Sequence, residues 1–207
     1  MDVKSLTGAL SCINKNMQDQ KDYLVSLDQK FGDGDLGISM AAGFNAVDNF
    51  LQTCEEKDLG KVCMKCAAVF NETSPSSLGT IISLGFMGMA KALKGKEEAT
   101  VHETAAALEA GLQKIMDKAK SKPGEKTILD AVYPAVEALK SGSNDNKLAA
   151  FQAAAEAATA GSESTKQMQS VHGRAAYYGE KSIGCVDGGS VVGKIIFNSI
   201  YEYLQTK

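Results

Sequence analysis

The chain has 207 residues, of which 44% are hydrophobic and 23% are charged, and its formal net charge is −3. This length and composition suit one globular domain over residues 1–207 with a substantial core. No polybasic run is present, so we expect neither nucleic-acid binding nor adhesion to an anionic membrane.

The start of the chain has no long apolar stretch after a basic region, and we therefore expect neither a signal peptide nor a transmembrane span. The five cysteines, an odd number, are scattered along the sequence and predict a cytoplasmic protein with reduced thiols. Cys63 and Cys66 match a C-x-x-C pattern, but no second pair and no histidine lies near them for zinc. Since a helical period runs through them, helix packing is the favoured interpretation.

Helices are predicted along most of the chain. Apolar residues return every three or four positions, which is the helical period, and they do so most clearly over residues 6–17, 101–116, 148–158 and 195–204. No segment combines the alternation of a strand with the turn residues that flank a hairpin. We predict an all-α fold of about eight helices, because short links favour up-and-down antiparallel packing.

The first loop with candidate chemistry contains Asp28, Asp33 and Asp35, interleaved with glycines that let the backbone turn sharply. Converging carboxylates repel one another unless a cation neutralises them, and Mg²⁺ takes hard oxygen ligands that it can share with substrate phosphates. A magnesium–nucleotide site is therefore expected here. A solvated acidic turn is the alternative for an isolated Asp-Gly-Asp, whereas the further acidic positions of an EF-hand calcium loop are absent.

Two later loops lead into apolar helices. The serine-rich segment 71–80 offers hydroxyl and backbone N–H groups at a helix start, which suit a phosphate, although serine is also an ordinary N-cap. The segment 122–130 is another turn into a helix, and a simple capped helix start explains it equally well.

The last polar cluster spans residues 173–189. Arg174 can hold a phosphate through two parallel hydrogen bonds. Asp187 begins an acidic, glycine-rich turn that opens the final helix. Taken alone, this segment also fits a surface loop.

Together, the four segments resemble the Dak2 domain family in order and spacing over nearly the whole chain. Within that family the chain resembles the nucleotide-binding L subunits of phosphotransferase-dependent dihydroxyacetone kinases. The matching elements are Asp28 with Gly32-Asp33-Gly34-Asp35, then Gly124-Glu125-Lys126-Thr127, and finally Gly173-Arg174-Ala175 followed by Gly179-Glu180-Lys181-Ser182-Ile183-Gly184.

The resemblance implies a closed barrel of eight antiparallel helices that binds ADP or ATP in the loops at one end. It implies that Asp28, Asp33 and Asp35 hold two magnesium ions and that Arg174 acts with them as a catalytic residue. The residues that it places beside the nucleotide are Leu36, Gly37, Ile38, Ser39, Ser74, Pro75, Ala119, Ile128, Arg174, Asp187, Gly188 and Gly189.

The resemblance also implies partners. A separate K subunit would carry dihydroxyacetone on a histidine and receive the phosphoryl group from the nucleotide. In the bacterial branch, a phosphohistidine-bearing M subunit would recharge ADP that stays bound, whereas other members use free ATP. Two alternatives are a Dak2-type kinase subunit for another short sugar, a polyol or a partner-held substrate such as a fatty acid, and a non-catalytic nucleotide-binding regulator that contacts a transcriptional regulator.

Three positions depart from the family's pattern. Leu36 stands where His or Cys is usual, residues 71–75 replace a glycine-rich phosphate loop, and Gly188 replaces the proline of Asp-Pro-Gly. These departures leave the phosphate donor and acceptor open. His172 matches no catalytic position of the family and is expected to be a surface or capping residue.

Overall fold

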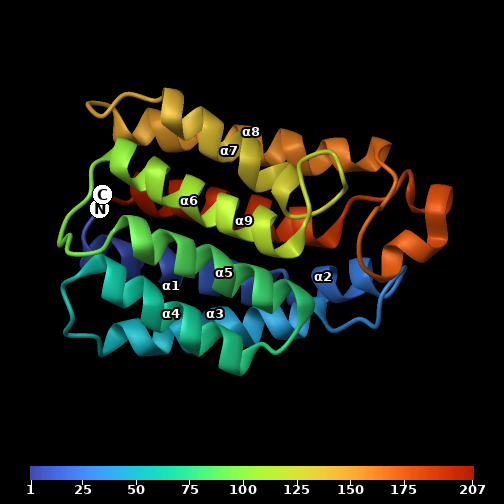
Figure 1. The fold of residues 1–207 in the computed structure, drawn as a ribbon, viewed down its shortest axis with the longest axis horizontal. Helices are drawn as coiled ribbons and strands as arrows, with labels where there is room; N and C mark the ends of the chain where they lie inside the picture. The colour runs from blue at the N-terminus through green and yellow to red at the C-terminus, as the bar shows by residue number, and fades with distance from the viewer.

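The computed structural model describes residues 1–207, which form nine α-helices, two 3₁₀ segments and no β-sheet (Figure 1). The predicted all-α fold is confirmed. Helices α1 and α2 are separated by Gln20 alone, so the predicted number of about eight holds when they are taken as one interrupted helix. None of the helices combines the length and the apolar composition that a membrane span requires. The elements are α1 (Val3–Asp19), α2 (Lys21–Asp28), α3 (Leu36–Gln52), α4 (Leu59–Thr73), α5 (Ser77–Ala92), α6 (Val101–Ala119), α7 (Leu129–Ser141), α8 (Lys147–Ser164), η1 (Thr165–Gln167), η2 (Arg174–Ser182) and α9 (Gly188–Gln205).

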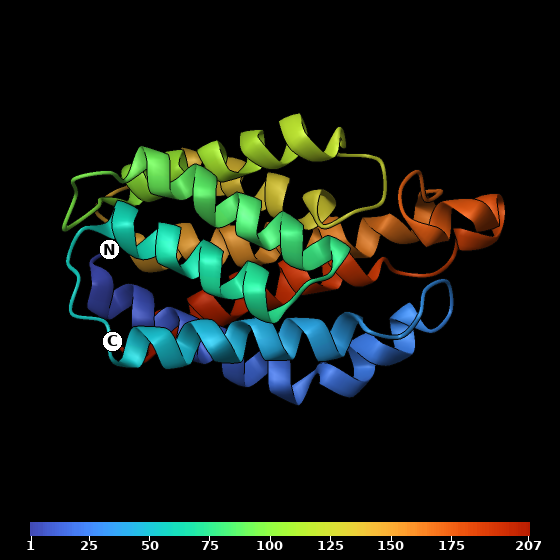
Figure 2. The ribbon, with the colours of Figure 1, turned by 60° about the horizontal axis from the view of Figure 1, so that its bottom comes forward.

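The helices close into a ring. Each α-helix packs against the next one along the chain, and α1 also packs against both α3 and α9. The predicted antiparallel barrel is therefore confirmed. Both termini lie at one end of the molecule, and the loops α2–α3, α4–α5, α6–α7 and α8–α9 gather at the other end (Figures 1 and 2).

Side-chain caps fix where several helices begin. Thr100 and Glu103 form a capping box at the start of α6, in which each side chain accepts a hydrogen bond from the other residue's backbone N–H. Asp187 caps α9 and Ser76 caps α5 without such a reciprocal bond, each through one side-chain oxygen that accepts a backbone N–H. Two of these caps, Ser76 and Asp187, lie at the end of the barrel where the polar loops gather.

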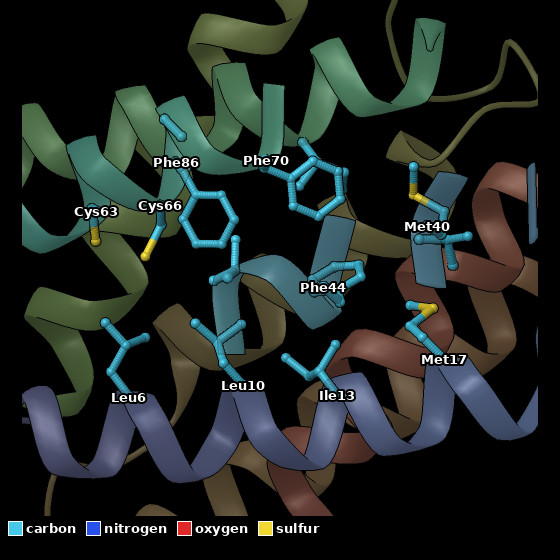
Figure 3. Close-up of a cluster of buried hydrophobic side chains, with 14 of the residues drawn as sticks. Leu6, Leu10, Ile13, Met17, Met40, Phe44, Cys63, Cys66, Phe70 and Phe86 are labelled. Carbon is cyan, nitrogen blue, oxygen red and sulfur yellow. The ribbon is translucent and has the colours of Figure 1, made fainter. Parts of the chain in front are cut away.

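The core fills the ring from several helices at once (Figure 3). The rings of Phe44 on α3 and Phe70 on α4 pack edge to face, with their centroids 5.0 Å apart. The electric quadrupoles of aromatic rings favour this arrangement. The stripe predicted at the start of the chain faces this core, and its buried members on α1 are Leu6, Leu10, Ile13 and Met17.

Cys63 and Cys66 both lie in this core on α4 and are fully buried (Figure 3). Burial raises the pKa of the Cys63 thiol to about 12 and that of Cys66 still further from its usual range. The prediction that this C-x-x-C pattern serves helix packing is confirmed.

A close helix approach and an apolar cavity complete the interior. A Cβ atom on Gly88 of α5 would lie only 2.5 Å from the Cα of Gly111 on α6, so these two glycines allow the helices to touch. The interior of the ring contains an apolar cavity of about 360 Å³, lined mostly by apolar side chains. Ile128 lines this cavity and is also the last residue before α7. It therefore lies between the interior and the end of the barrel where the loops gather.

Candidate functional site

The loop between α2 and α3 brings three carboxylates together. One oxygen from each of Asp28, Asp33 and Asp35 lies within 4.8 Å of the other two. The turn is held by Asp28, whose side chain accepts a hydrogen bond from the backbone N–H of Gly34 at 2.8 Å. Gly34 has a φ of +78°, a conformation that a side chain disfavours. The predicted convergence of the three aspartates is thus confirmed.

The three carboxylates perturb one another electrostatically. Partial burial, with the negative charges of Asp33 and Asp28, raises the pKa of Asp35 above its usual value. The only cation in an ion pair with the group is Arg174, whose Nη2 lies 2.8 Å from Oδ2 of Asp33. Three converging carboxylates offer the oxygen ligands that a hard divalent cation such as Mg²⁺ prefers.

The serine-rich loop meets the start of α3. Ser76 accepts a hydrogen bond from the backbone N–H of Gly79 at 3.1 Å, and its own hydroxyl lies 3.3 Å from that of Ser39. Ser74, two residues earlier, is fully buried, whereas Pro75 is exposed. The Ser74 hydroxyl lies 3.5 Å from that of Ser76. Ser39 and Ser74, which were predicted to line one site, therefore belong to one cluster of hydroxyl groups.

The first turn of α9 touches two other loops. A Cβ atom at Gly188 would lie 2.5 Å from Cδ2 of Leu36, and one at Gly189 would lie 3.3 Å from the backbone nitrogen of Ile128. The start of α9 therefore sits between the start of α3 and the end of the α6–α7 loop. Four residues predicted beside a nucleotide are in close contact here.

Asp187 precedes these glycines and caps α9 by accepting a hydrogen bond from Ser190 N–H at 2.6 Å. Burial raises the pKa of the Asp187 carboxyl to about 7, although this hydrogen bond and the nearby ammonium of Lys126 act in the opposite direction. The site thus contains a carboxyl whose charge changes near neutral pH.

The α6–α7 loop is organised by Asp130. Its buried carboxylate accepts hydrogen bonds from Gly124 N–H at 2.5 Å and from Thr127 N–H at 2.7 Å. The segment is therefore more than a capped helix start, because Asp130 lies inside α7 and folds the preceding loop back on itself. Ala119 is the last residue of α6, and the C-terminal end of this helix lies where the polar loops gather (Figure 1).

The α8–α9 segment that contains η2 contacts both the acidic loop and the α6–α7 loop. Arg174 pairs with Asp33, and the rings of Tyr178 and Phe31 meet with centroids 5.1 Å apart. His172 Nε2 lies 2.6 Å from Oε2 of Glu125, so this histidine joins two loops and is more than the surface or capping residue that was expected. No local pattern predicts this pair, because its members lie in different polar segments.

Comparisons with known proteins agree with this geometry. The DAK2 domain model matches residues 30–202. The PEP-dependent dihydroxyacetone kinase, ADP-binding subunit DhaL, of Escherichia coli (strain K12) is 31% identical over 173 residues, which cover 83% of this chain and 82% of that protein. The Triokinase/FMN cyclase of Rattus norvegicus is 28% identical over 207 residues, which cover 99% of this chain and 36% of that protein.

A solved structure shows the same likeness in three dimensions. The dihydroxyacetone kinase from C. freundii in complex with AMP-PNP and Mg²⁺ matches with a TM-score of 0.77 and 25% sequence identity. The match covers 95% of this chain and 33% of that chain, so the barrel corresponds to about a third of the larger protein.

Proposed function

The chain belongs to the DAK2 domain family, and we propose that it is the nucleotide-binding subunit of a dihydroxyacetone kinase. The observation that carries the proposal is the convergence of Asp28, Asp33 and Asp35 at the end of the barrel where the polar loops meet. Relatives named as ADP-binding subunits of dihydroxyacetone kinases support it over most of their length. The enzyme class is a phosphotransferase with an alcohol group as acceptor.

The three aspartates would hold two Mg²⁺ ions, which neutralise nucleotide phosphates when bound. Phosphoryl transfer depends mainly on positioning and charge stabilisation, and Arg174 would add a positive charge beside the phosphates. The residues that would bind ADP or ATP remain those predicted: Leu36, Gly37, Ile38, Ser39, Ser74, Pro75, Ala119, Ile128, Arg174, Asp187, Gly188 and Gly189.

The acceptor would arrive on another subunit. Apolar side chains exposed around a site are typical of protein interaction surfaces, and the end of the barrel with the acidic loop has several. Tyr177 on η2 is the most exposed of them, with 91% of its surface accessible. This supports docking of a K subunit that holds dihydroxyacetone, and of an M subunit that recharges bound ADP. The exposed apolar residues of this end are Tyr23, Ile38, Val171, Tyr177, Tyr178 and Ile183.

A second candidate is a Dak2-type kinase subunit for another short sugar, a polyol or a partner-held substrate. The departures from the family's pattern at Leu36, residues 71–75 and Gly188 favour it, because all three belong to or adjoin residues that we propose bind the nucleotide. A non-catalytic nucleotide-binding regulator is the third.

Calorimetry with Mg-ADP, with and without EDTA, tests the nucleotide site, and metal-independent binding of equal strength would refute it. Reconstitution with candidate K and M subunits, with phosphate transfer followed over time, separates the three functions. Transfer to dihydroxyacetone supports the first, transfer to another acceptor the second, and binding without transfer the third. ADP that stays bound through gel filtration would indicate the phosphotransferase-dependent branch, and free exchange with ATP would indicate the other.

A further inference from the structure

Lys126 is a buried lysine for which the proposed function has no role so far. Only 4% of its surface is exposed, although lysine is rarely buried unless it is paired. Its ammonium group donates one hydrogen bond to the carbonyl oxygen of Thr165 at 2.5 Å and another to that of Cys185 at 2.6 Å. The side chain therefore joins the α6–α7 loop to two backbone segments that lie far away in the sequence.

The two acceptors flank the turn that leads into α9. Thr165 follows α8 directly, and its hydroxyl accepts a hydrogen bond from Asp187 N–H at 3.0 Å. Gly184 N–H donates to the carbonyl oxygen of Lys166 at 2.8 Å. The turn over residues 184–187 is thus held against the end of α8 from both sides, with the Lys126 ammonium bridging the two segments.

Holding Lys126 in this place has a cost. Burial lowers the pKa of its ammonium, while the negative charges of Asp187 and Asp130 oppose that shift. The backbone of Lys126 also has a φ of +60°, in the left-handed region that residues other than glycine rarely adopt. Such costs are typical of functional positions that the surrounding structure has to maintain.

We propose that Lys126 is a positioning residue of the nucleotide site, which fixes the Cys185 turn and thereby places Asp187, Gly188 and Gly189. Without the ammonium, the carbonyl groups of Thr165 and Cys185 would lose a shared donor. The turn would then be free to move away from Leu36 and Ile128, which the first residues of α9 touch. This inference rests on the proposed function. Lys126 has no hydrogen bond to the aspartate triad, so its effect on metal and on nucleotide should differ.

Lys126→Met tests the proposal, because methionine fills similar space without a donor. Lys166→Met is the matched control, since Lys166 lies beside Thr165 but its side chain is exposed and pairs only with Glu163 at the surface. Three properties are measured: hydrogen exchange of the Gly184, Asp187 and Ser190 amides without ligand, Mn²⁺ binding by electron paramagnetic resonance, and Mg-ADP affinity by calorimetry.

In Lys126→Met, the exchange of these amides should rise and Mg-ADP affinity should fall by at least about tenfold, which is about 1.4 kcal/mol. Mn²⁺ binding without nucleotide should match wild type, and Lys166→Met should match wild type in all three properties. A folded Lys126→Met that loses Mn²⁺ and Mg-ADP binding together would overturn the positioning role. Unchanged exchange and unchanged affinity in Lys126→Met would also overturn it.

Lys126→Gln covers the case in which Lys126→Met does not fold, because its amide keeps a donor for one of the two carbonyls. In Lys126→Gln, amide exchange should rise and Mg-ADP affinity should fall, each by less than in Lys126→Met. If both properties of Lys126→Gln equal those of wild type, the proposal is refuted. A wild-type protein that fails to bind Mg-ADP would refute the proposed function. If wild type binds Mg-ADP and the Lys126 variants bind it equally well, only the inference about Lys126 is refuted.

Discussion

The guanidinium group of Arg174 lies 2.8 Å from the carboxylate of Asp33, so the candidate phosphate ligand and a candidate metal ligand are paired with each other. A cation bound at the aspartates would compete with Arg174 for Asp33. Once displaced, Arg174 would be available to a phosphate beside the metal. Ligand binding would therefore replace the Arg174–Asp33 ion pair by two new contacts, one between Asp33 and the metal and one between Arg174 and the phosphate.

Arg174→Gln should change metal binding and nucleotide binding in opposite directions. Mn²⁺ binding without nucleotide should strengthen by a few-fold, because an exposed ion pair contributes no more than about 1 kcal/mol. Mg-ADP affinity should weaken by about 10- to 100-fold, as for loss of a hydrogen bond to a charged group. Paramagnetic resonance and calorimetry measure the two effects. Lys181→Gln, a change of an exposed cation on the same η2 segment, is the control, and a parallel loss of both affinities in Arg174→Gln would contradict the exchange.

Asp35→Asn should abolish the stabilisation of the protein by Mg-ADP without unfolding it. Because the folded pKa of Asp35 is raised, its carboxylate lowers stability at neutral pH, and this effect disappears in acid, where the group is protonated in both states. The ligand-free variant should therefore melt at the wild-type temperature or slightly above it at pH 7. Wild type should melt higher with Mg-ADP by mass action.

Thermal melting with and without Mg-ADP checks this result for Asp35→Asn and Asp33→Asn. Asp22→Asn is the control, since Asp22 is an exposed aspartate on α2 outside the triad. If either triad variant keeps the full ligand-induced shift, these residues are a solvated acidic turn and the metal assignment is wrong.

The fold could be predicted from the sequence because its signals are local. The apolar stripe of α1 repeats within 17 residues, and each helix of the ring needs such a face toward the interior. The interruption at Gln20 was not predictable, because neither glycine nor proline marks it. The grouping of Asp28, Asp33 and Asp35 was also a local signal, since the three lie in one short loop.

The contacts that join the loops could not be predicted in the same way. Lys126 reaches Cys185, and His172 reaches Glu125, only because the ring brings the α6–α7 and α8–α9 loops to one end. Such pairs depend on helix lengths and on the closure of the ring, neither of which the period of apolar residues determines.

The two departures from the family's pattern at Leu36 and Gly188 lie against each other, and their substitutions should be coupled. Gly188→Ala would place a Cβ atom 2.5 Å from Cδ2 of Leu36, so it should destabilise the protein by about 1–3 kcal/mol. In a Leu36→Ala background that atom is absent, and the same change should cost less. Urea unfolding of the two single variants and the double variant measures the coupling. Purely additive effects would show that the two departures are independent.

The free energy of unfolding of the ligand-free protein should depend on the ionisation of Asp187. Burial raises the pKa of Asp187 in the folded protein to about 7. The pKa of an aspartate in an unfolded chain is about 3.9. The stabilising contribution of this group is therefore fully present below the unfolded pKa and is lost as the pH rises through the folded pKa. The ionisation of Asp187 should therefore lower the free energy of unfolding as the pH rises from about 4 to about 8.

Asp187→Asn should remove that part of the pH dependence and should make the ligand-free protein more stable than wild type at pH 8. Asparagine keeps a side-chain oxygen that can accept from Ser190 N–H, and it is as good an N-cap as aspartate, but it cannot ionise. Urea unfolding of both proteins from pH 5 to pH 8 measures the difference. Asp58→Asn at the start of α4 is the control, because it exchanges another capping carboxylate for an amide. Equal slopes of stability against pH in wild type and Asp187→Asn would show that Asp187 is already charged across this range in the folded protein.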